Sequence, residues 1–202
     1  MIADGGYRFG NCSVRVYDKF ANAPSLSYLY DRCLLSAPNR TFGVLPESFC
    51  GMTDLSRDAV CAYLHGRIPL LLMIAGNDVI GFSFPTIWAG VKQGTISPDP
   101  GRSMFMGYVI FRPYWSQPES VVAMMLTGIY YFHTYNLLSI HGQRYPWNHL
   151  TAKFLKQFGV RDTGIIPDFI LSGNRLVDCI TSSLSRADFE SYVTRTIAGC
   201  TP

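Results

Sequence analysis

The sequence has no long apolar segment. Its longest apolar stretches, residues 68–75 and 121–132, fall well short of the ~18 residues that a membrane-spanning helix needs. The amino-terminal residues also lack a basic region followed by an apolar core, which is the pattern of a secretory signal. We therefore expect a cytoplasmic protein without a membrane partner.

The sequence also lacks the usual metal-binding patterns. The chain has six cysteines but no Cys-x-x-Cys pair, so the spacing offers neither a zinc site nor a disulfide framework, and we expect reduced thiols. Its four histidines do not show the spacing of metal ligands. A Gly-x-Ser-x-Gly motif, which positions the nucleophile of many hydrolases, is absent. We therefore predict neither a metal site nor a serine hydrolase.

Charged residues are scarce. They make up 15% of the chain, and the formal net charge is +3. No run of Lys or Arg occurs, so the sequence does not support a nucleic-acid-binding surface. Hydrophobic residues make up 48%, which predicts a well-covered sheet or an apolar partner surface. The small positive charge would tolerate an anionic ligand without requiring one.

The most informative stretch runs from residue 104 to residue 160. Residues 104–111 form a short apolar run containing Tyr, Val, Ile and Phe, which predicts a strand. After a turn at Pro113, residues 121–132 place apolar side chains at three- and four-residue steps, which predicts a helix. A strand joined tightly to a helix presents the helix-end amides beyond the sheet. Amides in that position can hold an anion.

A second strand and helix follow. Residues 137–141 are predicted to form the strand, and the helix is expected to begin at Asn148 and end at Gly159, where a left-handed residue is typical. The other predicted elements are a strand at residues 13–17, helices at 25–35 and 53–64, hairpins at 69–88 and 165–181, and a last helix capped by Ser185 and Asp188. The expected irregular segments are a loosely held arm at residues 1–13, a long loop at 36–52 and a turn-rich connection at 90–101.

Several short motifs occur in a specific order along the chain. They are Gly107-Tyr108, Tyr114-Trp115 before a helix, Tyr131-Phe132, Asn148 with Thr151, and Phe158-Gly159-Val160 with Gly164. In this order the chain resembles the GNAT N-acetyltransferase superfamily over roughly residues 68–190, and it is most similar to the branch that acetylates the N-termini of ribosomal proteins. The resemblance implies a single α/β (α+β) domain over residues 1–202. Its mixed, mostly antiparallel sheet would have about six or seven strands flanked by helices, with the strands at 104 and 137 as parallel neighbours.

The resemblance also implies a function. It implies transfer of an acetyl group from acetyl-CoA to a primary amine, on a protein N-terminus or a small molecule. The residues expected to hold the pantetheine arm through their backbone groups are Tyr108, Val109 and Ile110. The candidates for the phosphates are the amides of Gln117, Glu119 and Ser120 and the side chains of Arg112 and Gln117. Asn148 and Thr151 match further cofactor-binding positions, although Asn148 equally fits a helix cap.

Two positions depart from the family pattern in the phosphate loop. Ser116 and Pro118 stand where the family has glycines, and Pro118 has no amide to donate. Ser116 and Glu119 also have the spacing of a capping box, whose carboxylate would compete with a phosphate for the positive end of the helix. The alternative is therefore a GNAT-fold protein without transferase activity, which serves as a binding or assembly module.

The catalytic groups also depart from the family pattern. Many relatives use a tyrosine as general acid seven residues after the Asn, and here that position is Leu155. His141, which could relay a proton near neutral pH, and Tyr145 are the replacements that we predict. A histidine at a strand end is also a common structural residue, so both interpretations of His141 stay open. The sequence predicts neither the acceptor nor the oligomeric state.

Overall fold

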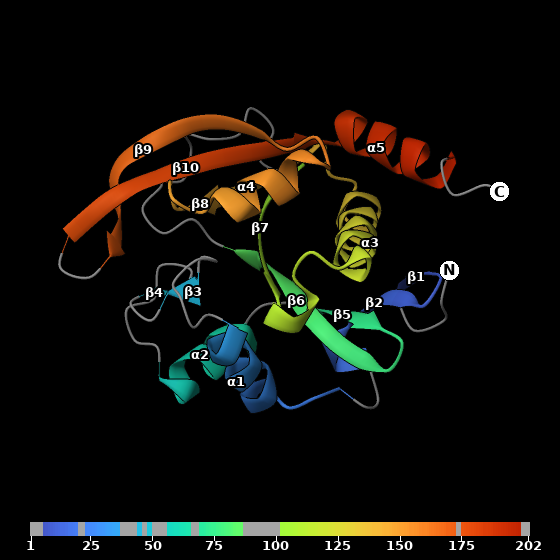
Figure 1. The fold of residues 1–202 in the computed structure, drawn as a ribbon, viewed down its shortest axis with the longest axis horizontal. Coiled ribbons are helices and arrows are strands. Elements are labelled where there is room, and N and C mark those ends of the chain that lie inside the picture. Colours follow the sequence, from blue (N-terminus) through green and yellow to red (C-terminus); the bar gives the residue numbers. More distant parts are fainter. Residues whose placement is uncertain are drawn as a thin grey trace.

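A computed structural model describes residues 6–19, 23–36, 44–45, 48–49, 56–65, 69–86, 102–172 and 175–198. Within them an eight-stranded sheet has the order β1-β2-β5-β6-β7-β8-β10-β9 (Figure 1). Every neighbouring pair is antiparallel except β7 and β8, which are parallel. The mixed, mostly antiparallel sheet and its parallel central pair are therefore confirmed, with more strands than the sequence predicts.

The elements follow the predicted order. The strands of the large sheet are β1 (Tyr7–Phe9), β2 (Cys12–Val16), β5 (Leu71–Ala75), β6 (Asp78–Thr86), β7 (Ser103–Ile110), β8 (Ser139–Arg144), β9 (Arg161–Ser172) and β10 (Arg175–Ser185). A small second sheet pairs β3 (Val44–Leu45) with β4 (Ser48–Phe49). The helices are α1 (Leu26–Ser36), α2 (Arg57–His65), α3 (Pro118–Thr134), α4 (His149–Lys156) and α5 (Arg186–Ala198). Short 3-10 turns are η1 (Tyr17–Lys19) and η2 (Arg112–Tyr114). Each predicted helix and hairpin is present, with its ends shifted by a few residues.

The prediction of a loosely held amino-terminal arm is wrong for residues 7–13. Residues 7–16 form the hairpin of β1 and β2, in which Tyr7 lies opposite Val14. Gly10 supplies the positive φ (+59°) of the turn, so a glycine that suggested a loose segment instead closes a hairpin. The Tyr7 ring packs edge-on against Tyr130 of α3, with 6.2 Å between the ring centres. The predicted connection at residues 90–101 and most of the predicted loop at 36–52 lie outside the described residues.

Two apolar clusters cover opposite faces of the sheet. One joins residues of α3, α4 and α5 to side chains such as Met73 and Ile80. The other joins α1 and α2 to side chains such as Phe82. Because side chains alternate along a strand, β7 serves both clusters: Tyr108 faces α3 and α4, and Val109 faces α1 and α2. Figure 1 shows α1 and α2 together, apart from the other three helices.

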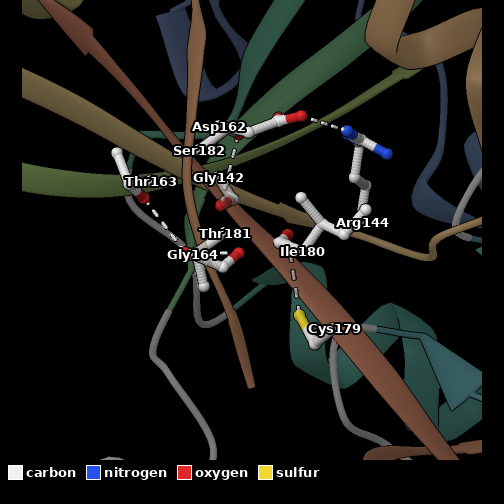
Figure 2. A network of polar contacts seen from close by, with 9 residues as sticks. All are labelled: Gly142, Arg144, Asp162, Thr163, Gly164, Cys179, Ile180, Thr181 and Ser182. Carbon is white, nitrogen blue, oxygen red and sulfur yellow. Dashed lines mark hydrogen bonds and ion pairs between the residues drawn. The ribbon is translucent and has the colours of Figure 1, made fainter. Parts of the chain in front are cut away.

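Side chains tie β8 to the last hairpin (Figure 2). Arg144, at the end of β8, is 7% exposed and forms an ion pair of 2.7 Å with Asp162 of β9. The Ser182 hydroxyl of β10 donates to the Gly142 carbonyl of β8 at 3.5 Å. The end of β8 is therefore held on the β10 side by side chains as well as by the backbone ladder.

Candidate active site

The two parallel strands separate after a short paired section. β7 and β8 pair over three residues, the last pair being Phe105 and His141. Beyond that pair, β7 continues to Ile110 along β6, and β8 continues to Arg144 along β10. We call these continuations, Met106–Ile110 and Gly142–Arg144, the unpaired section, because their inner edges face each other with no ladder between them. In Figure 1, β8 to β10 lie on one side of this section and β6 to β1 on the other.

Alternation along β7 decides which backbone groups face β8. The Phe111 amide donates to the Ile80 carbonyl of β6 at 2.8 Å, and Val109 points the same way. In an antiparallel pair the intervening residues, here Tyr108 and Ile110, direct their N–H and C=O groups to the opposite edge. Of the three residues that the sequence assigns to the pantetheine arm, two therefore face the unpaired section, whereas the backbone groups of Val109 are used by β6.

Trp115 forms a hydrogen bond to one of these backbone groups. Its indole Nε1–H donates to the Ile110 carbonyl at 2.8 Å. That carbonyl is no longer available to a ligand, so the N–H and C=O of Tyr108 and the N–H of Ile110 form the free edge of the unpaired section. An exposed edge of this kind can pair with an extended ligand that carries amide groups.

The Tyr108 side chain is unusual because its hydroxyl is buried without a hydrogen bond of ordinary geometry to any described residue. Burial raises the pKa of this phenol, and the nearby Thr151 side chain of α4 opposes the rise. The ring of Tyr108 lies 6.5 Å from that of Phe154, also on α4. Thr151 is therefore the nearest polar neighbour of this hydroxyl but does not satisfy it with good geometry, and a buried hydroxyl in that state costs free energy.

The loop between β7 and α3 does not form the predicted capping box. Gln117, not Ser116, is the N-cap residue of α3, and its side chain makes no capping hydrogen bond. Pro118 is the first helical residue, which is the position that proline favours. Ser116 lies outside the helix with φ = +63°, so its hydroxyl does not cap the helix. Glu119 is in the first helical turn, where a carboxylate suits the helix dipole.

Internal hydrogen bonds hold this loop. The Gln117 amide donates to the Tyr114 carbonyl at 3.2 Å, and the Ser120 amide donates to the Gln117 carbonyl at 3.1 Å. The buried Ser120 hydroxyl also donates to the Tyr114 carbonyl. Two of the three amides that the sequence assigns to the phosphates therefore have partners inside the loop. The amides of Ser116 and Glu119 have none among the described residues, and they lie at the positive end of α3.

Ser116 has the backbone conformation that a glycine would adopt. Its φ of +63° costs an L-residue about 1–2 kcal/mol, and a glycine would lose about 0.4–1 kcal/mol through its more flexible unfolded chain. Ser116→Gly is therefore expected to raise the free energy of unfolding by about 0.5 kcal/mol, as measured by urea denaturation. A decrease of similar size would show that the serine side chain makes a stabilising contact that outweighs the strain.

Asn148 caps α4 as one of the two sequence interpretations predicts. Its Oδ1 accepts a hydrogen bond from the Thr151 amide at 3.2 Å, and the residue is 3% exposed. Thr151 lies in the first turn of α4 and faces Tyr108. Asn148 and Thr151 are thus brought to the face of β7 that carries the Tyr108 hydroxyl. Their role toward a cofactor stays a prediction.

His141 lies at the point where β7 and β8 separate. Its Nε2 is 2.9 Å from the Ser139 hydroxyl, which in turn is 2.8 Å from the Ser103 hydroxyl. Its ring packs against that of Phe105 in a tilted arrangement, with 5.1 Å between the ring centres. Burial lowers the pKa of His141, so the imidazole is neutral near pH 7 and can accept a proton.

The other predicted side chains lie further along the chain. Tyr145 is buried in the turn after β8 and stacks on Trp147 at 4.9 Å. Arg112 is exposed in η2, at the start of the loop that leads to α3. Ser103 and Ser139 belong to no motif in the sequence, so sequence reasoning does not single them out. The contact of Ser103 with Ser139 depends on the register of β7 and β8, which a pattern of residue types does not encode.

No group of three or more His, Cys, Asp or Glu side chains among the described residues could hold a metal ion. None of their helices is both long enough and apolar enough to cross a bilayer.

Neither a family model nor a curated protein matches the sequence. The structure is similar to RimJ from Mycobacterium smegmatis in complex with CoA-disulfide, with a TM-score of 0.66, 14% identity, and coverage of 93% of this chain and 88% of that chain. It is also similar to ribosomal-protein-S5-alanine acetyltransferase from Vibrio fischeri, with a TM-score of 0.61, 15% identity, and coverage of 91% of this chain and 98% of that chain. A third similar structure is a GCN5-related N-acetyltransferase from Brucella melitensis, with a TM-score of 0.71, 12% identity, and coverage of 98% of this chain and 86% of that chain. The chain therefore has the fold of the GNAT acetyltransferases.

Proposed function

We propose that this chain is an acyl-CoA-dependent N-acetyltransferase that acts on a primary amine. The observation that carries the proposal is the free edge of Tyr108 and Ile110 in the unpaired section, which continues into the positive end of α3. An extended arm with two amides and a pyrophosphate at one end matches this order of groups: backbone edge first, helix-end amides second. The GNAT fold supports the same assignment.

The described residues fit such a co-substrate. The free N–H and C=O of Tyr108 would pair with the amides of the pantetheine arm, and the buried Tyr108 hydroxyl would gain a partner. The unpartnered amides of Ser116 and Glu119 would donate to the phosphates. When bound, acetyl-CoA supplies an activated acetyl group.

His141 is the group that we assign to proton transfer. An acceptor amine must lose a proton as it becomes an amide, and a neutral imidazole can take that proton at neutral pH. His141 is half-buried at the end of the paired section, and burial keeps its pKa below the ordinary histidine value. His141 pairs with Phe105, and by alternation along β7 Phe105 lies on the same face as Val109. The His141 side chain is therefore on the face that α1 and α2 cover, and the Tyr108 side chain is on the other face.

Release of the CoA thiol tests the proposed function. The purified chain is mixed with acetyl-CoA and one acceptor at a time: a peptide with a free N-terminal alanine, spermidine, or the same peptide already acetylated. We expect thiol release that depends on a free amine, with mass spectrometry locating the acetyl group on nitrogen. A rate equal to that of the acetylated control for every amine in a broad panel would contradict the proposal.

The alternative, a GNAT-fold binding or assembly module without transferase activity, has one observation in its favour. The amides of Gln117 and Ser120 are already used within the loop, and Pro118 has none to give. A pyrophosphate would therefore meet fewer donors than a glycine-rich loop provides. If the chain is such a module, we expect that acetyl-CoA either does not bind or binds without amine-dependent release of the CoA thiol.

Asn148 offers a test that separates capping from cofactor binding. Asn148→Ala removes the Oδ1 that accepts from Thr151, so it is expected to lower the free energy of unfolding by about 1 kcal/mol and to weaken acetyl-CoA binding. Asn148→Ser keeps a capping oxygen and is the matched control. Calorimetric titration and thermal melts are measured on both variants. If serine restores stability but not affinity, Asn148 contacts the co-substrate; if it restores both, Asn148 is only a cap.

A further inference from the structure

Two serine hydroxyls form a chain of hydrogen-bond contacts that ends at the His141 ring. Ser103, at the start of β7, lies opposite Ser139, at the start of β8, and their Oγ atoms are 2.8 Å apart. The Ser139 Oγ is 2.9 Å from His141 Nε2, on the same face of β8. The second ring nitrogen, Nδ1, makes no hydrogen bond to any described residue. The two nitrogens of this ring are therefore in different surroundings.

The described surroundings of the ring carry no charge. Phe105 of β7 packs against it, Ser183 of β10 lies opposite it in the ladder, and Ser139 lies two residues before it. None of these residues is charged, and burial is the cause of the lowered pKa. The tautomer of the neutral ring is therefore set by hydrogen bonding, because no nearby charge selects it among the described residues.

We propose that the Ser139 hydroxyl donates to the Ser103 oxygen and accepts from His141 Nε2–H, which positions His141 as the tautomer with its proton on Nε2 and leaves Nδ1 to take the proton of the acceptor amine. The inference rests on the proposed function and names the atom that does its chemistry. The amine nitrogen bonds to the acetyl carbon, its N–H bond breaks and an Nδ1–H bond forms, and the C–S bond of the thioester breaks to release the thiolate. The imidazolium keeps its Nε2–H on the Ser139 oxygen, and the proton later leaves Nδ1 for the thiolate sulfur of CoA. Ser139 is a positioning residue, since it acts through the histidine and is assigned no contact with the acceptor or with acetyl-CoA.

The tautomer can be measured directly. Nitrogen NMR of ¹⁵N-histidine-labelled protein distinguishes protonated from unprotonated ring nitrogens, and a His141→Gln sample identifies the His141 signals among the four histidines. We expect wild type above the His141 pKa to have a protonated Nε2 and an unprotonated Nδ1. Ser139→Ala is expected to lose this preference, and Ser139→Thr, which keeps the hydroxyl, to retain it. A protonated Nδ1 in wild type, or an unchanged preference in Ser139→Ala, would overturn the inference.

Steady-state kinetics are the second test of this inference, and they include a matched control variant. Ser139→Ala is expected to lower kcat about tenfold, a fraction of what loss of a whole general base costs, with the KM for acetyl-CoA unchanged. Ser183→Ala removes a hydroxyl that also lies opposite His141 but makes no bond to it, and is expected to leave both kcat and the tautomer unchanged. An equal loss of kcat in both variants would contradict the inference. If wild type transfers no acetyl group, the proposed function fails, while the NMR arm still decides the role of Ser139.

Discussion

His141→Gln is expected to lower kcat by about 100-fold or more while acetyl-CoA binds as tightly as before. The loss follows from the position of the ring at the end of the paired section, where it is the predicted proton acceptor. Glutamine keeps a polar group that can bond to Ser139, so the variant removes proton transfer without opening a hole beside Phe105. Steady-state kinetics and calorimetric titration are measured on the same preparation.

His149→Gln is the control for this substitution, because His149 is exposed at the start of α4 and has no assigned role. Unchanged kcat in His141→Gln would leave His141 as a structural residue, the other interpretation of a histidine at a strand end. The pH profile gives an independent check. Protonated His141 cannot accept a proton, and burial lowers its pKa below 6.5, so kcat/KM is expected to fall only at pH values below 6.5. That acid limb is expected to disappear in the variant.

Phe189→Ala is expected to lower the free energy of unfolding by about 3–5 kcal/mol. Phe189 is 2% exposed and is the one buried residue of α5, all of which the structure describes. Its ring stacks on Phe132 of α3 at 5.1 Å. It also lies over Gly128, where a Cβ atom would be 2.5 Å from the Phe189 Cζ. Removing the ring therefore empties a closely fitted space between two helices.

Ile197→Ala is the matched control on the same helix. Ile197 is 44% exposed, so its truncation is expected to change stability by less than about 0.5 kcal/mol. Both variants are compared with wild type by urea denaturation. A loss below about 1 kcal/mol in Phe189→Ala would mean that α5 is not anchored through this ring.

The sequence predicts the order and type of the elements well because most of them carry clear periodicity or turn residues. The Gly76-Asn77 turn between β5 and β6 and the capping box of α5 are examples. In that capping box the Ser185 hydroxyl lies 3.1 Å from the Asp188 amide and 2.8 Å from the Asp188 carboxylate. The amino-terminal hairpin was missed because β1 is only three residues long and its stability comes from β2 and α3.

The second predicted capping box failed for a reason that the sequence contains. Proline favours the first helical position, and this preference makes Gln117 the N-cap and moves Ser116 one residue outside the helix. The preference of Pro118 for the first helical position therefore outweighs the Ser-x-x-Glu spacing. Once outside, Ser116 takes a glycine-like φ, so the departure from the family's glycine changes the residue type more than the backbone shape.

The geometry of the candidate site could be predicted only in part. The resemblance assigns the pantetheine arm to β7, but it does not say that Tyr108 and Ile110 face β8 while Val109 faces β6, because that choice depends on the register of β6 against β7. The same holds for Ser103 and Ser139, whose contact depends on the register of a parallel pair thirty-six residues apart in sequence.

Hydrogen exchange of individual backbone amides in the presence of acetyl-CoA tests the central claim most directly. We expect saturating acetyl-CoA to slow exchange of the backbone amides of Tyr108 and Ile110 and of the loop amides of Ser116 and Glu119. Val109, whose backbone groups already pair with β6, is expected to change little and serves as an internal reference. Protection of Tyr108 would place the extended arm along the unpaired section. No protection at Tyr108 and Ile110 with acetyl-CoA at millimolar concentration would contradict the account.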